Sequence, residues 1–331
     1  MAINNPTAHP DTGASPGRPA AGSFDDGGLF RIEIPSVEGP DALDAVLEAA
    51  QSRGVPVHRV SQGSGVAMLS DAEISQMVRT CAARDVELCL FLGPRGTWDV
   101  GAAARSDANG LGPRVRGGDQ LRYSLDDARR AADLGVRCLL VADEGVLWAA
   151  HQLRVKGGLP ADLRLKLSAL VGPANPASFR VVQGLGADSI NIPGDLSLHQ
   201  IAELRSAGSA AIDLYVESPD GAGGFVRHHE LPEFVRVGAP IYLKFGLRNA
   251  PDIYPVGEHL REVALATGRE RVRRAELGLA LLDRHGLLAE MSPAGAREIG
   301  TLARFDEPHD GQSSAAELQR ERQNERAKGT L

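Results

Sequence analysis

The chain has 331 residues, enough for one large domain or two ordinary ones. Its formal net charge of −7 and pI near 5.8 argue against a protein whose main partner is duplex nucleic acid, and no apolar run reaches the roughly 18 residues of a membrane span. Three cysteines without a CxxC pair argue against a disulfide framework or an iron–sulfur cluster and indicate a cytoplasmic protein.

Residues 1–28 contain no hydrophobic signal core, so we expect a disordered tail rather than a secretion signal. From residue 29 to residue 305, short apolar runs alternate with amphipathic stretches. We predict strands over 31–36, 56–63, 86–93, 136–143, 163–171, 187–193, 212–218 and 240–246. Clear helical patterns cover 41–53, 71–84, 124–134, 144–156, 196–207 and 259–285. Residues 306–331 are polar and charged, and we expect a second tail there.

Helix boundary signals support this order of elements. Ser70 and Glu73 have the spacing of a capping box, and glycines such as Gly54 and Gly135 stand where helices should end. Eight strand–helix units in one chain predict an α/β fold, a (β/α)8 TIM barrel. An open, doubly wound sheet is the alternative.

The strand predicted over 240–246 carries a lysine among apolar residues. Ile241, Leu243 and Phe245 alternate with two other residues, and this apolar set must face the helix layer. Tyr242 and Lys244 therefore point into the barrel. Burying an amine costs several kcal/mol unless it is paired or neutral.

The same alternation directs polar side chains from other strands into the barrel: Arg31, Glu33, Lys166, Ser168, Ser189, Asn191, Asp213, Tyr215 and Glu217. A barrel that only needed filling would use branched aliphatic residues there. We expect Lys244, Lys166, Glu217 and Glu33 to be catalytic, and Asn191, Tyr215 and Tyr242 to line the substrate site. The alternative is that these lysines and glutamates only neutralise one another.

Three loops at the carboxyl ends of the strands add anion-binding candidates. The loop over 93–122 is rich in glycine and arginine, Arg95 among them, and is expected to be a lid or an anion clamp, with a mobile insertion as the alternative. Further along, backbone N–H groups of Gly223 and Gly224 could approach an anion, as could three neighbouring side chains: Arg227, Arg248 and Asn249.

Other constellations are less specific. Asp143 and Glu144 end the fourth strand, and one of them, Asp143 in our choice, is a candidate general acid or base. The alternative is that Glu144 only starts the next helix, where its charge suits the dipole. His228 could bind a divalent metal with Glu217 and Asp143. We find no dinucleotide fingerprint and no Walker loop, so we expect no NAD.

Residues 160–280 resemble the collagenase-like peptidase family U32. The similar segments are "GADSINIPGDLSLHQIAELR", "DLYVESPDGAGGFVRHHELPEFVRVGAPIYLKFGLRNAPDIYP" and "RVRRAELGL". The resemblance implies a barrel fold and a peptidase or related hydrolase. The family's cysteine-containing signature segment is absent, so the RNA-base hydroxylation associated with it is not implied here.

Three functions are open at this point. The first is an enzyme that acts on a small phosphorylated or carboxylated metabolite through lysine and carboxylate acid–base or Schiff-base chemistry, of lyase, aldolase or isomerase type. The second is the metal-dependent hydrolase or peptidase that the resemblance implies. The third is a non-catalytic barrel. The expected partner is a small anion, and self-association into a homo-oligomer is left open.

Overall fold

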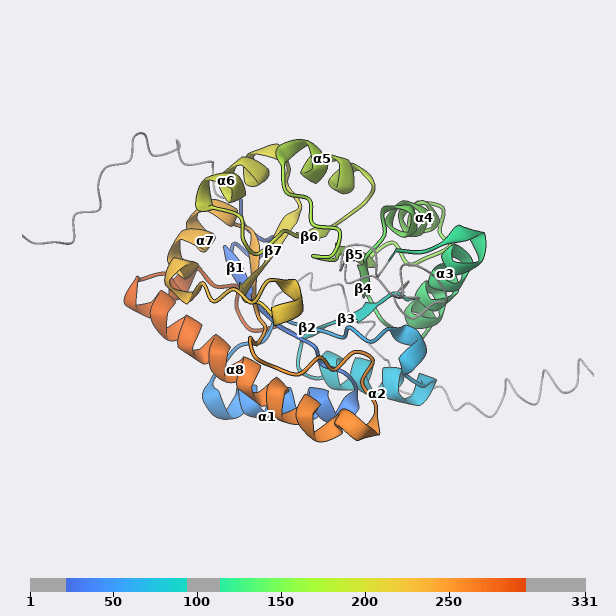
Figure 1. Ribbon diagram of the computed structural model, residues 1–331, viewed down its shortest axis with the longest axis horizontal. Coiled ribbons are helices and arrows are strands. Elements are labelled where there is room, and N and C mark those ends of the chain that lie inside the picture. The colour runs from blue at the N-terminus through green and yellow to red at the C-terminus, as the bar shows by residue number, and fades with distance from the viewer. Residues whose placement is uncertain (1–21, 94–113, 296–331) are drawn as a thin grey trace, which may run out of the picture.

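A computed structural model describes residues 22–93 and 114–295 of the chain. Within them, eight parallel strands form a closed barrel in chain order, because β1 pairs with both β2 and β8 (Figure 1). The strands are β1 (Phe30–Pro35), β2 (Arg59–Ser61), β3 (Glu87–Phe91), β4 (Cys138–Val141), β5 (Arg164–Leu167), β6 (Ser189–Asn191), β7 (Ala211–Glu217) and β8 (Ile241–Phe245). The predicted barrel is confirmed, and its closure excludes the open sheet.

An outer layer of helices surrounds the strands (Figure 1). They are α1 (Pro40–Arg53), α2 (Asp71–Ala82), α3 (Gly117–Asp133), α4 (Glu144–Val155), α5 (Pro176–Gly184), α6 (Leu198–Ala207), α7 (Leu231–Gly238) and α8 (Arg261–Arg284). The predicted capping box starts α2: Ser70 accepts from the backbone N–H of Glu73, whose carboxylate accepts from the N–H of Ser70. Gly54 ends α1 with φ of 64°, a conformation that favours glycine.

The hydrophobic core lies between the strands and the helices. Ile32, Ile34 and Leu243 belong to one buried apolar cluster with helix residues such as Leu43 of α1 and Leu282 of α8, as expected for strand residues that face outward from the barrel axis. Phe245 reaches α8, where its ring would be within 3 Å of any side chain added at Gly278. This packing leaves the barrel interior to the polar residues.

Two segments differ from the sequence-based prediction. Helix α3 starts at Gly117, so the end of the stretch expected as a loop over 93–122 is helical. Residues 94–113, with Arg95, lie outside the described residues. At the amino-terminal side, Phe24 and Asp26 belong to the stretch expected as a tail, but they contact the side chain of Arg31. Within the described ranges, every helix is too short or too polar to cross the hydrocarbon core of a bilayer.

Candidate active site

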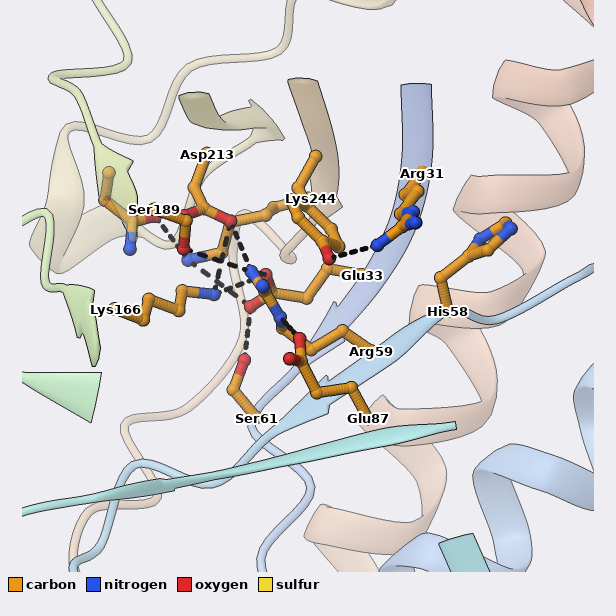
Figure 2. Close-up of polar contacts among 12 residues, drawn as sticks. Arg31, Glu33, His58, Arg59, Ser61, Glu87, Lys166, Ser189, Asp213 and Lys244 are labelled. Carbon is orange, nitrogen blue, oxygen red and sulfur yellow. Dashed lines mark hydrogen bonds and ion pairs between the residues drawn. The ribbon is translucent and has the colours of Figure 1, made fainter. Parts of the chain in front are cut away.

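An ion-pair network fills the middle of the barrel (Figure 2). Glu33 of β1 accepts hydrogen bonds from Lys166 of β5 and from the hydroxyl of Ser61. Arg59 of β2 donates from Nη1 to Asp213 at 2.8 Å and lies 3.3 Å from a carboxylate oxygen of Glu33. The network therefore ties together strands on opposite sides of the barrel.

The charges of the network hold one another ionised. Burial alone would raise the pKa of Glu33, but the nearby charges of Lys166, Lys244 and Arg59 outweigh it and hold that pKa well below its usual range. Burial would likewise lower the pKa of Lys166, but Asp213 and Glu33 raise it above the ordinary lysine value. Lys166 is fully buried and stays protonated, so it is a poor candidate for the reactive amine.

The network contains as many buried cations as buried carboxylates. Arg59 also donates from Nε to Glu87, the third carboxylate. The network's cations are Arg59, Lys166 and Lys244, and its carboxylates are Glu33, Glu87 and Asp213. Such balance is what a buried ionic cluster needs, because a single unpaired charge there would cost several kcal/mol.

Lys244 lies at the edge of this network, near the carboxyl end of β8. Its Nζ donates to the amide oxygen of Asn191 at 2.7 Å, and the nearest oxygen of Glu33 is 3.7 Å away. Its Nζ also stands 4.0 Å from the centroid of the Tyr215 ring, a cation–π contact. Asn191 is itself oriented, since its amide donates to the backbone oxygen of Leu167 at 2.8 Å.

Tyr242 lies at the other end of the barrel, not beside Lys244. Its ring carries the Arg59 guanidinium 3.6 Å from the centroid, and its hydroxyl accepts from Arg31 at 3.1 Å. Burial raises the pKa of Tyr242 to about 12, so the phenol is neutral. The inward orientation expected for Tyr242 is correct, but the structure does not bring it to Lys244.

Glu217 does not point into the barrel, contrary to the prediction from alternation. The pairing of β7 with β8 shifts between Tyr215 and Glu217, so Glu217 is opposite Phe245, which faces the helices. Its carboxylate lies 3.5 Å from both His228 and Arg274 and accepts from the backbone N–H of Arg248 at 3.0 Å. Burial would raise the pKa of Glu217, but these contacts lower it.

The structure does not assemble the predicted metal ligands. Glu217 and His228 are neighbours, but Asp143 is the N-cap of α4, where it accepts from the backbone N–H of Val146 at 3.0 Å. Across residues 22–93 and 114–295, no three side chains of His, Cys, Asp or Glu are grouped to hold a metal ion. Glu144 is the first residue of α4, as the alternative to acid–base chemistry had it, and Asp143 caps that helix.

The predicted anion loop after β7 uses its donors internally. The N–H of Gly223 donates to the carbonyl of Asp220, and that of Gly224 to Pro219. Arg227 bonds Glu230 and the carbonyls of Gly194 and Leu196. These groups hold the loop in shape rather than face a ligand.

Two residues after β8 are exposed instead of lining a site. Arg248 lies 3.5 Å from Asp220, and the backbone N–H of Asn249 donates to the same side chain. Both residues thus join the loop after β8 to the loop after β7.

Arg59 and Glu87 are central to the network, although neither was selected as a candidate from the sequence. In "PVHRVSQG", Arg59 and Ser61 alternate with His58 and Val60, and Val60 is fully buried. The alternation used for the other strands would have placed Arg59 inside. Glu87 is the first residue of β3, "ELCLF", and its only charged residue, so this strand shows no alternation that would direct the Glu87 side chain inward.

Comparison with known proteins gives only distant structural likenesses. Neither a protein-family model nor a curated protein matches the chain. The U32 peptidase Mk0906 is 19% identical with a TM-score of 0.40, covering 60% of this chain and 73% of that one. A 2,3-dimethylmalate lyase is 16% identical with a TM-score of 0.43, covering 88% of this chain and 94% of its own. Orotidine 5′-monophosphate decarboxylase from Methanocaldococcus jannaschii is 13% identical with a TM-score of 0.43, covering 76% of this chain and 98% of its own.

At this distance the three structures assign no reaction or substrate to the chain. One of them is a U32 peptidase, the family that the sequence resembles. Membership of that family stays a prediction.

Proposed function

We propose that this chain is a barrel enzyme that binds a small carboxylate or phosphate substrate at the carboxyl ends of its strands, against Lys244. The observation that carries the proposal is the contact set of Lys244. Its closest hydrogen-bond partner is the neutral amide of Asn191 at 2.7 Å, whereas Glu33 is 3.7 Å away. Lys244 is therefore less neutralised than Lys166, and it lies near the end of the barrel where this fold builds active sites.

We assign Lys244 an electrostatic role rather than Schiff-base chemistry. Its Nζ is fixed in place, 2.7 Å from the amide oxygen of Asn191 and 4.0 Å from the centroid of the Tyr215 ring. A fixed ammonium in a water-poor site stabilises negative charge that develops on a substrate oxygen, and it can donate a proton there. This chemistry fits lyase, aldolase or isomerase reactions, in which an oxygen next to the reacting carbon gains charge.

A second candidate is a barrel without catalysis. The equal numbers of interior cations and carboxylates favour it, since a network that neutralises itself needs no ligand. The metal-dependent hydrolase has less support, because Asp143 caps α4 and does not join Glu217 and His228.

Native mass spectrometry of protein purified without affinity metal tests the first proposal. We expect a retained small anion, or stabilisation by a panel of phosphorylated and carboxylated metabolites in thermal unfolding. Lys244→Met should remove that stabilisation, whereas Lys156→Met, at the exposed end of α4, should not. No retained ligand and no response to the panel would favour the non-catalytic barrel.

Borohydride treatment in the presence of a responding metabolite separates the two lysine chemistries. An electrostatic role predicts no covalent adduct. A trapped adduct on Lys244 would show that it reacts as a nucleophilic amine and would overturn the electrostatic role.

A further inference from the structure

Two cysteines on neighbouring strands face each other inside the barrel. In the pairing of β3 with β4, Cys89 stands directly opposite Cys138. Each is followed in its strand by a leucine of the outer apolar core, Leu90 and Leu139 respectively. Because successive side chains of a strand point to opposite faces, both thiols point into the barrel. Both cysteines are fully buried there.

This arrangement has the spacing of a disulfide. Neighbouring strands of a sheet lie about 4.8 Å apart, and the Cα atoms of disulfide-bonded cysteines are usually about 4.4–6.8 Å apart. The two thiols also interact, since burial first, and then a hydrogen bond with the Cys89 thiol, raise the pKa of Cys138 well above the usual thiol value. An S–S bond between them requires little movement of either strand.

The two thiols differ in their surroundings. The hydrogen bond keeps Cys138 protonated, so Cys138 is its donor and Cys89 its acceptor. Cys89 also lies near a buried ammonium: burial lowers the pKa of Lys166, but the two carboxylates that hold it, and after them the Cys89 sulfur, raise it. Negative charge that develops on the Cys89 sulfur during attack is therefore stabilised by a cation and by a hydrogen-bond donor.

A cavity of about 370 Å³ leads toward the pair from the amino-terminal end of the barrel. Its wall includes Arg59, Glu87 and Arg164, the first residues of β2, β3 and β5. Arg164 stands opposite Cys138 in the pairing of β4 with β5. The charges of Arg59 and Glu87 both act on the Cys138 thiol. The inner wall of the cavity thus borders the cysteine pair, and a molecule as small as a peroxide approaches it from this end.

We propose that Cys89 and Cys138 are a redox modification site, at which a small peroxide forms a disulfide between β3 and β4. The Cys89 sulfur attacks one peroxide oxygen, the O–O bond breaks, and the thiol proton leaves with the other oxygen, which gives a sulfenic acid. The Cys138 sulfur then attacks the Cys89 sulfur, the S–O bond breaks, and the proton of Cys138 leaves with the hydroxyl as water. Two thiols thus lose two electrons and two protons to one peroxide. The proposal does not rest on the function assigned to Lys244.

Thiol counting after treatment of the native full chain with hydrogen peroxide tests the site. Once the peroxide has been removed, the protein is unfolded in iodoacetamide, and mass spectrometry identifies the alkylated and the linked cysteines. We expect the number of alkylated cysteines to fall from three to one, with a linked Cys89–Cys138 peptide that dithiothreitol separates. The remaining alkylated residue should be Cys81, a matched control because it is equally buried, in α2 and the outer apolar core.

Two variants assign the order of the steps. In Cys138→Ser the reaction should stop at the sulfenic acid, so dimedone should label Cys89. In Cys89→Ser, dimedone should label Cys138 at least tenfold less. The modification site is overturned if all three cysteines of the native protein remain alkylated after treatment, or if the linked peptides contain Cys81. Equal labelling in the two variants would overturn the assignment of Cys89 as the nucleophile.

Discussion

Glu33 of β1 and Lys166 of β5 form an ion pair across the barrel, although 133 positions separate them in the sequence. Both side chains are fully buried. The pair anchors a network in which each charge is held by neighbours from other strands, so removal of one member exposes its partners to the full cost of burial.

Lys166→Met should destabilise the protein by about 3–5 kcal/mol, because it leaves Glu33 and Asp213 with one cation fewer in a buried site. Urea unfolding measures the difference, with the exposed Lys156→Met as control. Adding Glu33→Gln to Lys166→Met should recover part of the loss, since one charge of each sign is then removed. Equal stability of wild type and Lys166→Met would contradict the proposed role of the pair.

His58 should make the protein less stable in acid. Its Nε2–H donates to the carbonyl of Ser292 and its Nδ1 accepts from the N–H of Ile32, and burial lowers its pKa to about 4 from 6.5. Between these values the unfolded chain binds the extra proton, so stability falls as pH drops from 6.5 to 4. The free energy of unfolding lost over this pH interval is about 3 kcal/mol, at 1.36 kcal/mol for each unit of pKa difference.

Urea unfolding at pH 7 and pH 5 measures this dependence. His58→Gln should be less stable at pH 7 but lose less stability on acidification. His199→Gln is the control, because His199 is 72% exposed on α6. If His58→Gln lost as much stability between pH 7 and pH 5 as the wild type, the acid sensitivity would belong to other groups.

Asp143→Ala should cost about 1 kcal/mol of stability, the usual effect of losing an N-cap. The wild-type side chain accepts from Val146 N–H and lies 3.3 Å from Val115 N. Asp143→Ser keeps a capping oxygen and should recover most of that stability. If the protein proves to be an enzyme, Asp143→Ser should also keep its activity, whereas a general acid or base would lose it.

Gly63→Ala should disturb the loop after β8. A methyl group at residue 63 would stand within 3 Å of the Tyr254 ring, whose hydroxyl bonds Ser36 at the end of β1. Overpacking of this kind costs about 1–3 kcal/mol. Tyr254→Ala removes the clash, so the cost of Gly63→Ala should vanish in that background when both are measured by urea unfolding. A cost that persists would place its origin at Gly63 itself.

Much of the barrel could be predicted because its evidence is periodic. Alternation in "PIYLKFG" placed Lys244 inside and Phe245 outside, and the glycine and capping signals bounded several helices. What alternation cannot give is distance across the barrel. Whether Lys166 meets Glu33 or only water depends on closure of the sheet, which no local pattern encodes.

Glu217 shows the second limit. Its place in the sequence continues the inward series of Asp213 and Tyr215, and only the shift in pairing with β8 turns it outward. Bulges depend on how two strands meet, so one strand's sequence does not reveal them.

That bulge also keeps the electric charge of the lumen balanced. If β7 paired with β8 without the shift, Val216 would stand opposite Phe245, and strict alternation would carry Glu217 inward. Three carboxylates would become four against three cations, and Arg274 on α8 would keep only Glu270 as a partner. The extra residue in β7 therefore excludes one negative charge from the barrel without changing any side chain that lies there now.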